Sequence, residues 1–350
     1  MKMNANINEV AWSGLFKVAI VGATSLEGKE LKDVLTERNF PSSDVKLLDD
    51  EEAQGQLEAV GDEPTFVQSV TPEHLEGMDF TFFACDPAYT LNTWQAARDK
   101  GSEIVDLSYA LEAQAALRAP WVERELGREF RRQLESVPVV VAHPAAAVLA
   151  LLLLRLQRAA KVRSANATVF EPASERGRRG MDELHDQTVN LLSFQQMPTE
   201  VFGTQIAFNI VPAYGEGKRP AIAEVQDRIV RHYKWIVNKE VPTPSVLLLQ
   251  APVFHAHTFS IYAEMEDAIA IGDLESALSG EHVQMMRGDE NPSNVNVAGS
   301  SLVQVSVRAD STRKNGVWLW VAADNLRVTA SLAVEAAEEM ATMRPRGKVQ

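Results

Sequence analysis

The chain has 350 residues, of which 45% are hydrophobic and 23% are charged, so it is long enough to form two globular domains. Its formal net charge of -14 argues against nucleic acid or an anionic membrane surface as a partner, because both repel an acidic protein. The single cysteine, Cys85, excludes an internal disulfide and a cysteine-based zinc site. Residues 1–10 lack the apolar segment of a signal peptide, and we therefore expect a cytoplasmic protein.

The first part of the chain alternates short apolar strands with helical segments. The expected strands are Phe16–Val21, Val45–Leu48, Phe80–Ala84 and Ile104–Val105. Apolar residues at helical spacing follow the first strand and recur in Leu91–Lys100. Strands that alternate with helices predict a parallel, doubly wound sheet.

The run Val137–Leu154 is almost entirely apolar and approaches the roughly 20 residues that a bilayer crossing needs. His143 and Pro144 interrupt it, however, and arginines follow it closely. We interpret it as a buried strand at Pro138–Ala142, followed by a turn and a buried helix from about Ala145 toward Ala159. A membrane-spanning segment is therefore not expected.

The strands expected after Pro144 are longer and alternate in polarity. They are Ala165–Phe170, Gln205–Val211, Ser245–Ala251, His257–Glu264, Leu302–Val307 and Val317–Ala322. Helices are expected at Met181–Leu192 and Ala221–Tyr233, and a final amphipathic helix at Leu326–Met343. This pattern predicts a mixed or antiparallel sheet with helices covering one face.

The segment Gly22–Gly28 joins the first strand to a helix, which is the context of a dinucleotide-binding turn. In such a turn the backbone N–H groups and the helix N-terminus face a pyrophosphate. Gly22 would form the tight turn, and Gly28 would allow the helix to pack closely on the strand. Ser25 stands where a glycine usually lets the backbone approach the phosphates, which weakens cofactor binding without excluding it. A structural turn with no ligand is the alternative.

The end of the second strand usually selects between NAD and NADP. Here it runs into four consecutive carboxylates, from Asp49 to Glu52. One carboxylate can bind the ribose diol of NAD, whereas four would repel the 2′-phosphate of NADP. An exposed acidic loop is the alternative, and both interpretations disfavour NADP.

Seven segments, in chain order, resemble the aspartate-semialdehyde dehydrogenase family over roughly Lys17 to Met340. They are VGATSLEGKEL (21–31), FFACDPA (82–88), IVDLSYAL (104–111), GRRGMDELHDQT (177–188), FNIVP (208–212), APVFHAHTFSIYAEME (251–266) and ADNLR (323–327). The resemblance implies an α/β protein that forms a homodimer. It implies a Rossmann-like NAD(P)-binding domain at 15–143, an α+β dimerisation and catalytic-type domain with a mixed sheet at 144–322, and a C-terminal helix at 323–343 that returns to the first domain.

The family's reaction, as the resemblance implies it, begins when a cysteine thiolate attacks an aldehyde. Hydride then passes to NADP, and phosphate releases the acyl group. The family's cysteine motif matches the stretch from His143 to Ala147, and Ala146 falls at the position of the nucleophile. A methyl group cannot form a thioester, so this chain lacks the group on which the family mechanism depends.

The resemblance also places other residue types at four further positions of the family's active site. They are Glu171 for a glutamine, Gln250 for the carboxylate-binding arginine, Glu112 for the phosphate-binding arginine and Leu107 for an asparagine. His257 and Asn325 are retained. His257 is either a general base or a hydrogen-bonded core histidine.

Cys85 could replace the missing nucleophile, but it follows a strand of the first domain, and we interpret it as a buried packing residue. His255 could pair with His257, yet no third ligand is evident, and we expect no metal site.

Two other groups each allow two interpretations. Arg176, Arg178 and Arg179 form either an anion site or a solvated loop, and we favour the loop. Trp318 and Trp320 alternate on one strand and mark either a subunit interface or the core; we favour the interface.

Three functions are consistent with these observations. The first is a non-catalytic relative that keeps the fold, the dimer and the capacity to bind NAD or another small molecule. The second is an active NAD-dependent oxidoreductase for an aldehyde or oxo group, in which His257 and Glu171 act as acid and base without a covalent intermediate. The third is a structural protein with an empty cleft. The expected cofactor contacts are Gly22, Thr24, Ser25, Gly28, Asp49 and Asn325.

Overall fold

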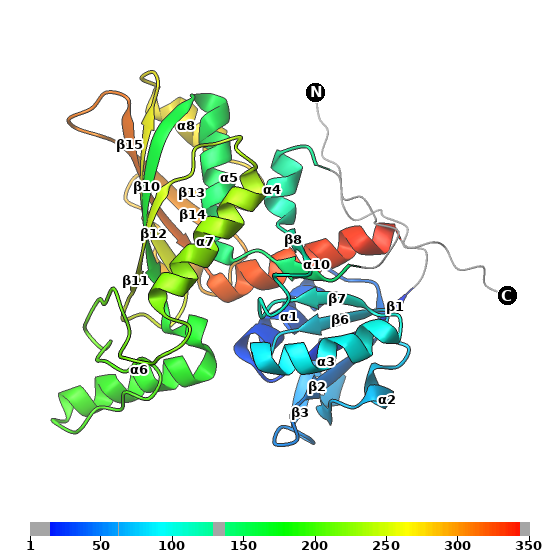
Figure 1. The fold of residues 1–350 in the computed structure, drawn as a ribbon. Coiled ribbons are helices and arrows are strands. Elements are labelled where there is room, and N and C mark those ends of the chain that lie inside the picture. Colours follow the sequence, from blue (N-terminus) through cyan, green and yellow to red (C-terminus); the bar gives the residue numbers. More distant parts are fainter. Residues whose placement is uncertain (1–14, 62, 129–136, 344–350) are drawn as a thin grey trace.

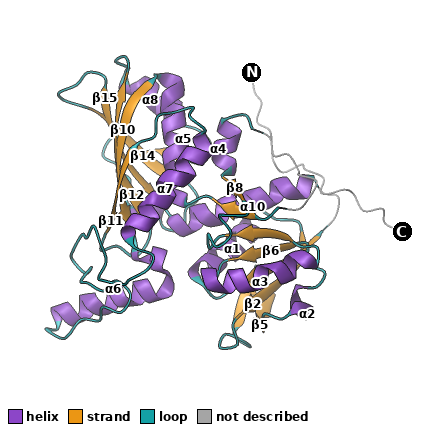
Figure 2. Ribbon diagram, in the orientation of Figure 1, coloured by secondary structure: helices purple, strands orange, loops and turns teal. Residues whose placement is uncertain are grey.

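The computed structural model describes residues 15–61, 63–128 and 137–343. Two units lie side by side, each built on its own β-sheet, and the long helix α10 (Asn325–Thr342) packs against the first of them (Figure 1). Figure 2 shows the helices of both units in purple and their strands in orange.

The first unit is a seven-stranded sheet in which every neighbouring pair of strands is parallel. Its strands, in spatial order, are β5 (Gln68–Ser69), β2 (Ser42–Asp49), β1 (Phe16–Val21), β6 (Phe80–Phe83), β7 (Glu103–Asp106), β9 (Val139–Val141) and β8 (Ala116–Arg118). Its helices are α1 (Leu26–Glu37), α2 (Pro72–Leu75), α3 (Pro87–Asp99) and α4 (Pro120–Glu125). The predicted parallel, doubly wound sheet is confirmed. The small hairpin of β3 (Leu57–Val60) and β4 (Glu63–Phe66) was not predicted.

The second unit is a six-stranded mixed sheet. Its strands, in spatial order, are β11 (Ser245–Gln250), β10 (Val162–Glu171), β12 (His257–Met265), β15 (Gly316–Ala323), β14 (Val303–Ala309) and β13 (Val283–Met285). Its helices are α5 (Pro144–Ala159), α6 (Gly177–Leu192), α7 (Ile222–Val237), α8 (Ile271–Leu278) and α9 (Asn294–Val297). Helices α5 and α7 lie on one face of the sheet, as predicted for this part of the chain (Figures 1 and 2).

The long apolar run forms a strand and a helix, as predicted. β9 is the strand, and α5 follows it after the turn at His143, whose imidazole accepts a hydrogen bond from the N–H of Ala145. Helix α5 has 16 residues and is buried from Pro144 to Leu156, because it packs against α7, α8 and β10. Within residues 15–61, 63–128 and 137–343, no helix is both long and apolar enough to cross a membrane.

The strand predicted at Gln205–Val211 is wrong. These residues form turns, and only Val211 makes an isolated β-bridge, to Gln250. The side chain of Gln187 satisfies this backbone: its Oε1 accepts from the N–H groups of Ile206 and Ala207 at 2.8 and 3.1 Å. A side chain of α6 thus takes the place of the neighbouring strand to which a strand at 205–211 would have bonded.

The basic segment 176–179 also differs from the prediction, because α6 begins at Gly177 rather than near Met181. Gly180 allows this early start. A Cβ atom at this position would lie only 2.5 Å from the carbonyl oxygen of Ala173, so a larger residue would displace the preceding 3-10 turn, Ala173–Arg176. Gly180 thus permits close packing of the 3-10 turn on the helix.

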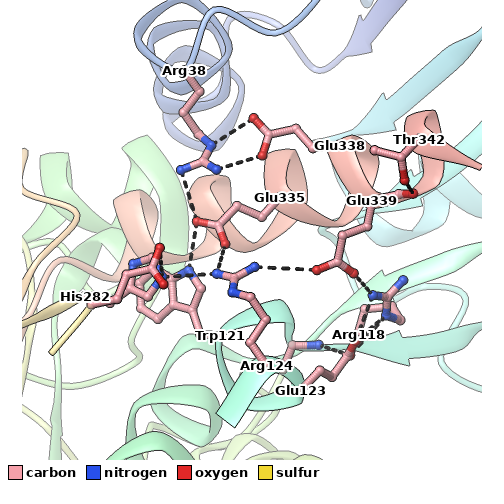
Figure 3. Close-up of polar contacts among 12 residues, drawn as sticks. Arg38, Arg118, Trp121, Glu123, Arg124, His282, Glu335, Glu338, Glu339 and Thr342 are labelled. Carbon is pink, nitrogen blue, oxygen red and sulfur yellow. Dashed lines mark hydrogen bonds and ion pairs between the residues drawn. The ribbon is translucent and has the colours of Figure 1, made fainter. Parts of the chain in front are cut away.

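Charged side chains fix α10 on the first unit (Figure 3). Arg38 of α1 donates to both carboxylate oxygens of Glu338, at 3.0 and 2.7 Å, and forms an ion pair with Glu335 at 3.2 Å. Arg124 and the indole N–H of Trp121, both from α4, donate to the same Glu335. Because Glu335 is buried, these partners offset the cost of placing its charge away from water. At the start of α10, Arg327 donates to Glu30 and Glu37 of α1, which holds the end of the helix where Asn325 lies.

Candidate functional site

The glycine turn after β1 has the tight geometry expected of a dinucleotide-binding turn. Gly22 has a φ of +86°, and a Cβ atom there would lie 2.4 Å from the carbonyl oxygen of Ala84. A Cβ atom on Gly28 would lie 2.2 Å from the carbonyl oxygen of Gly22. Both glycines are therefore required by the packing of β1, β6 and α1, whether or not a ligand binds.

The polar side chains of this turn have hydrogen-bond partners in the turn and on the neighbouring strands. Ser25 donates its hydroxyl to the carbonyl of Ala84 at 2.7 Å and accepts from the N–H of Gly28 at 2.9 Å, so its Oγ caps α1. The N–H and hydroxyl of Thr24 both donate to one oxygen of Asp49, at 2.8 and 2.7 Å. Asp49 is thereby held beside the turn at the carboxyl end of β2.

A cleft of about 540 Å³ opens in front of this turn. Leu26 and Glu27, in the first turn of α1, line one side, and the 3-10 turn Ala173–Arg176 lines the other. Arg179 also lines the cleft, and it has no recorded polar partner in the part of the chain that the structure describes. The cleft thus extends from the glycine turn of the first unit to the 3-10 turn of the second.

This cleft has features that fit a nicotinamide dinucleotide. The N–H groups of Leu26 and Glu27 have no hydrogen-bond partner among the described residues, and they lie at the positive end of α1, where a pyrophosphate would bind. Burial, followed by the charge of Asp106, raises the pKa of Glu27 to about 7, which reduces its negative charge near that position. Asp49 lies beside the turn at the carboxyl end of β2 and is not part of the cleft lining.

Three titratable side chains converge at the 3-10 turn, which forms the far wall of the cleft. Oε1 of Glu175 lies 3.6 Å from Nε2 of His257, at the start of β12. Oε2 of Glu175 lies 4.0 Å from Nε2 of His143, at the start of α5. Both imidazoles are almost fully buried, at 1% exposure, and Nε2 of His257 has no hydrogen-bond partner among the described residues.

Burial determines the charge of this cluster. It raises the pKa of Glu175 to about 8, together with the nearby carboxylates of Glu171 and Glu27, while a hydrogen bond with Asn325 acts in the opposite direction. Burial lowers the pKa of His257 to about 3, and it lowers the pKa of His143 well below its usual range. At neutral pH the cluster therefore consists of an uncharged carboxyl group and two uncharged imidazoles.

His143 holds a defined tautomer. Its Nδ1 accepts a hydrogen bond from the N–H of Ala145 at 3.2 Å, so in the neutral ring the hydrogen is on Nε2. Its own backbone N–H donates to Nδ1 of His232, at 2.9 Å, and the ring of Tyr109 stacks on the imidazole with centroids 5.7 Å apart. These contacts fix the ring with its Nε2–H group facing Glu175.

Glu171 belongs to a different group of side chains. The hydroxyl of Tyr214 lies 3.1 Å from Oε1 of Glu171 and 2.7 Å from Oε1 of Gln250. The amide of Gln250 donates to the carbonyls of Glu171 and Ala251, both at 2.9 Å. The carboxyl group recorded in contact with His257 is thus that of Glu175, and Glu171 joins β10 to β11 through Tyr214.

Asn325 ties three elements together near this cluster. Its Oδ1 accepts from the hydroxyl of Ser174 at 3.1 Å and from the N–H of Ala256 at 3.2 Å. Asn325 thus connects the start of α10 with the 3-10 turn and with the residue before β12. It orients Glu175 and His257 by fixing their neighbours, and its amide also bonds to Glu175.

The position that the family resemblance matches to the nucleophile closely follows His143 and Pro144 at the start of α5. Ala146 is in the first turn of α5, is fully buried, and donates its N–H to the carbonyl of His143 at 2.9 Å. Cys85 lies on the opposite side of the cleft, against Gly22, with its sulfur 3.3 Å from the hydroxyl of Thr90. Burial raises the pKa of this thiol to about 12, so it remains protonated and is a poor nucleophile.

Glu112 is held by basic partners rather than facing the cleft. Arg228 and Arg231 bond to its two oxygens, at 2.5 and 3.1 Å, and Nε2 of His232 lies 3.3 Å away. Although burial acts in the opposite direction, the bond with His232 and the charge of Arg228 lower the pKa of Glu112 to about 2. Leu107 is buried in the core.

The remaining candidates are distributed as follows. Among the described residues, no group of three or more His, Cys, Asp or Glu side chains, His255 included, is arranged to hold a metal ion. Arg176 stacks on the ring of Tyr214 at 4.4 Å. Trp318 and Trp320 are 45% and 39% exposed, and they alternate on β15 with Leu319 and Val321, which belong to the buried core.

Sequence reasoning did not identify His143 and Glu175 as functional candidates. The histidines of the cluster come from the starts of α5 and β12, far apart in the chain, and no spacing rule joins them. One signal was present: a histidine directly before the proline that begins a helix has its side chain at the helix N-terminus.

The fold and the cleft define a two-unit α/β protein in which a Rossmann-like domain precedes a domain with a mixed sheet. The description "Semialdehyde dehydrogenase, NAD binding domain" matches residues 17–147, and "Semialdehyde dehydrogenase, dimerisation domain" matches residues 153–328. The chain belongs to the semialdehyde dehydrogenase family, as the sequence predicted.

Individual relatives agree with this assignment. The chain is 28% identical over 335 residues to an aspartate-semialdehyde dehydrogenase of Rickettsia conorii, covering 93% of this chain and 97% of the relative. It is 31% identical over 327 residues to a USG-1 protein homolog of Azotobacter vinelandii, covering 92% and 96%. The structure of a probable aspartate-semialdehyde dehydrogenase from Pseudomonas aeruginosa superimposes with a TM-score of 0.83 at 26% identity, covering 94% and 99%.

Proposed function

We propose that this protein binds NAD, in preference to NADP, and does not carry out cysteine-dependent oxidation of an aldehyde. The observation that carries the proposal is Ala146, a buried methyl group beside His143 where the family resemblance expects the nucleophile. The chain's one cysteine, Cys85, lies on the other side of the cleft and is protonated at neutral pH, so it does not supply the missing thiolate.

The cleft supports the NAD part of the proposal. The α1 N-terminus would hold the pyrophosphate through the N–H groups of Leu26 and Glu27, and Asp49 would bind the ribose diol. Asp50 and Glu51 follow directly and are exposed, so a 2′-phosphate at this position would meet further negative charge. When bound, NAD supplies hydride exchange with a carbonyl or alcohol carbon.

We also propose that the protein is a cytoplasmic homodimer. The match of residues 153–328 to a dimerisation domain supports the dimer, and so does the exposed aromatic pair Trp318 and Trp320 on the uncovered face of the second sheet. The protein's single cysteine fits a reducing compartment.

A fluorescence titration with NADH and NADPH tests cofactor binding, and turnover of aspartate semialdehyde with phosphate tests the loss of activity. We expect NADH to bind more tightly than NADPH, and no turnover with either oxidised cofactor. An Asp49→Ala variant should weaken NADH binding, whereas an Asp33→Ala variant, altered on the exposed side of α1, should not. Tighter binding of NADPH, or turnover of the semialdehyde, would contradict the proposal.

A second candidate function is an NAD-dependent oxidoreductase that acts on an aldehyde or oxo group without a covalent intermediate. The observation that favours it is the approach of Glu175 to His257, since an uncharged carboxyl group can deliver a proton to a carbonyl oxygen. Glu175 replaces Glu171 as the partner of His257 in the acid and base pair expected from the sequence, because Glu171 bonds to Tyr214.

A further inference from the structure

We propose that Arg179, in the first turn of α6, binds the pyrophosphate of the dinucleotide from the second unit, so that both units hold the bound cofactor. The inference rests on the proposed function, because it takes NAD as the ligand of the cleft. It adds a binding residue outside the glycine turn, and it gives one arginine of the basic segment 176–179 a role in binding.

The starts of α1 and α6 line the same cleft from opposite sides. Leu26 and Glu27, the first two residues of α1, line it from the first unit. Gly177 and Arg179, in the first turn of α6, line it from the second unit. The two helices also lie next to each other. A long side chain at the start of α6 is therefore positioned to reach a group that is bound at the start of α1.

Basic side chains form much of the second-unit wall of the cleft: Arg176, Arg179, Lys218 and Arg219. Three of them have partners within the second unit. Arg176 donates to the carbonyl oxygen of Pro220, Lys218 donates to another backbone carbonyl, and Arg219 pairs with a carboxylate at 2.5 Å. Arg179 is exposed and has no recorded polar partner within residues 15–61, 63–128 and 137–343. Of these four side chains, Arg179 is therefore the one available to a ligand.

The first turn of α6 lacks the negative charge that stabilises a helix N-terminus. It contains no acidic residue, and the N-cap residue Arg176 makes no side-chain capping bond. Arg178 and Arg179 instead add positive charge at the positive end of the helix dipole. Because an anion bound beside this turn would reduce the repulsion, this end of α6 favours an anionic ligand.

Carboxyl groups also line the cleft, but they carry less negative charge than their number suggests. Burial raises the pKa of Glu27 to about 7 and that of Glu175 to about 8, so neither is fully ionised at neutral pH. Asp86 lies at the start of α3, where it accepts a hydrogen bond from the N–H of Ala88 at 2.8 Å. On the second-unit wall the four basic side chains therefore face Glu200 and a largely uncharged Glu175, and the wall attracts an anion.

A pyrophosphate matches the donors on the two sides of the cleft. The N–H groups of Leu26 and Glu27 can donate to it from the start of α1, as at other helix N-termini that bind phosphate. The guanidinium group of Arg179 can donate a parallel pair of hydrogen bonds to the phosphate oxygens that face the second unit. The ligand would thus contact both units at its most strongly charged group.

A fluorescence titration with NADH tests the contact in the full-length protein. Arg179→Ala should weaken NADH binding about tenfold, which is the factor expected for the loss of a partly exposed, charge-assisted hydrogen bond. The matched control is Arg178→Ala, which removes the same charge from the same turn at an exposed residue outside the cleft lining. NADH binding by Arg178→Ala should stay within about twofold of the native value. Equal losses in the two variants would reduce the effect to general electrostatics and overturn the inference.

ADP-ribose locates the contact within the cofactor, because it keeps the pyrophosphate and lacks the nicotinamide. In calorimetric titrations, Arg179→Ala should weaken the binding of ADP-ribose by the same factor as the binding of NADH. A loss of affinity for NADH alone would place Arg179 at the nicotinamide end of the ligand and contradict the proposed contact.

A conservative variant and the salt concentration separate direct binding from a structural role. Arg179→Lys keeps the charge but loses the paired donors, so its affinity for NADH should lie between those of the native protein and Arg179→Ala. Added salt should weaken NADH binding more in the native protein than in Arg179→Ala, because an exposed ion contact is screened. The same salt dependence in both proteins would rule out a direct ion contact.

Thermal unfolding checks the fold of the variants. Without ligand, Arg179→Ala should unfold at the native temperature, since the side chain is exposed and has no recorded polar partner within the described residues. At a fixed NADH concentration its unfolding temperature should rise less than that of the native protein. If Arg179→Ala is unstable, Arg179→Lys carries the comparison. If the native protein does not bind NADH, the proposed function and the inference both fail; if it binds NADH and Arg179→Ala binds it equally well, only the inference fails.

Discussion

The indole of Trp121 and the imidazole of His282 stack with their centroids 4.2 Å apart and 10° between their planes, where α4 of the first unit meets the loop before β13 of the second. Arg124 donates to the same imidazole at 3.1 Å and also bonds to Glu335 of α10 (Figure 3). The contact between Trp121 and His282 thus joins the two units. The bonds of Trp121 and Arg124 to Glu335 connect this contact to α10, the helix that begins at Asn325.

Removing this contact should destabilise the whole protein. Trp121 is 1% exposed and donates its indole N–H to Glu335 at 3.1 Å, so Trp121→Ala leaves both a cavity and a poorer environment for a buried carboxylate. We expect a loss of about 3–5 kcal/mol in the free energy of unfolding, measured by urea denaturation. Trp235→Ala is the control, since Trp235 is 69% exposed and should change stability by less than about 0.5 kcal/mol. Similar losses in the two variants would contradict this assignment.

The raised pKa of Glu175 links stability to pH. The folded protein holds this proton up to about pH 8, whereas the unfolded chain releases it near pH 4.5. The folded state therefore binds more protons between these values, and its stability falls as the pH rises through this window. Glu171, Glu27, Arg176, Tyr109, His143 and His257 surround the carboxyl group and contribute to the slope.

Glu175→Gln removes this titration. At pH 8 to 9 the variant should be more stable than the native protein by on the order of 1 kcal/mol or more, and at pH 5 the two should be similar. Thermal unfolding across this range measures the difference. Glu200→Gln should follow the native profile, because Glu200 lies in the cleft away from the imidazoles. An unchanged pH profile in Glu175→Gln would show that this carboxyl group is ionised in the folded protein.

Much of the fold could be predicted because local patterns determine it. The strand Phe16–Val21 was predicted with the observed bounds, and the interrupted apolar run gave β9 and α5. The failure at Gln205–Val211 has a tertiary cause: the side chain of Gln187 satisfies the backbone there, and no pattern within the segment reveals a partner on another helix.

The candidate site was predictable only in part. The glycine turn is contiguous, so the sequence indicates it directly. The match of Ala146 to the family's nucleophile stays a prediction from the resemblance. The Glu175 cluster is different. It joins the start of α5, a 3-10 turn and the start of β12, and the pKa of its carboxyl group depends on burial. The spacing of residues along the chain does not predict that these three elements lie close together, and it does not predict that the Glu175 carboxyl group is buried.

The uncovered face of the second sheet provides a test of the proposed dimer. Trp318 and Trp320 project from β15 and are partly exposed, and Tyr262 packs beside Trp318 with ring centroids 4.9 Å apart. Replacing both tryptophans with serine should shift the protein from dimer to monomer in sedimentation velocity, since large aromatic residues carry much of an interface's binding energy. Trp235→Ser, a change to an exposed tryptophan of α7, should leave the dimer intact. Dimerisation of the double variant at the native affinity would place the interface elsewhere.

Introducing a thiol at position 146, where the family resemblance expects the nucleophile, tests whether a thiol there is enough for the family's reaction. Ala146→Cys places a sulfur in the first turn of α5, where the helix dipole favours the thiolate. We nevertheless expect no turnover of aspartate semialdehyde. Gln250 is fully engaged with Glu171, Ala251 and Tyr214, and it has no positive charge to bind a substrate carboxylate.

Glu112 presents a second obstacle in that variant. Its carboxylate pairs with Arg228 and Arg231, so the charge of these arginines is offset and is not free to bind a phosphate. Adding Gln250→Arg and Glu112→Arg to Ala146→Cys should therefore give more activity than Ala146→Cys alone, if the fold tolerates the exchange. Circular dichroism and thermal unfolding check that tolerance, and initial rates of NADH or NADPH formation measure the gain. Substantial turnover by Ala146→Cys alone would show that the nucleophile was the one essential loss, and that the other replaced positions contribute little to the reaction.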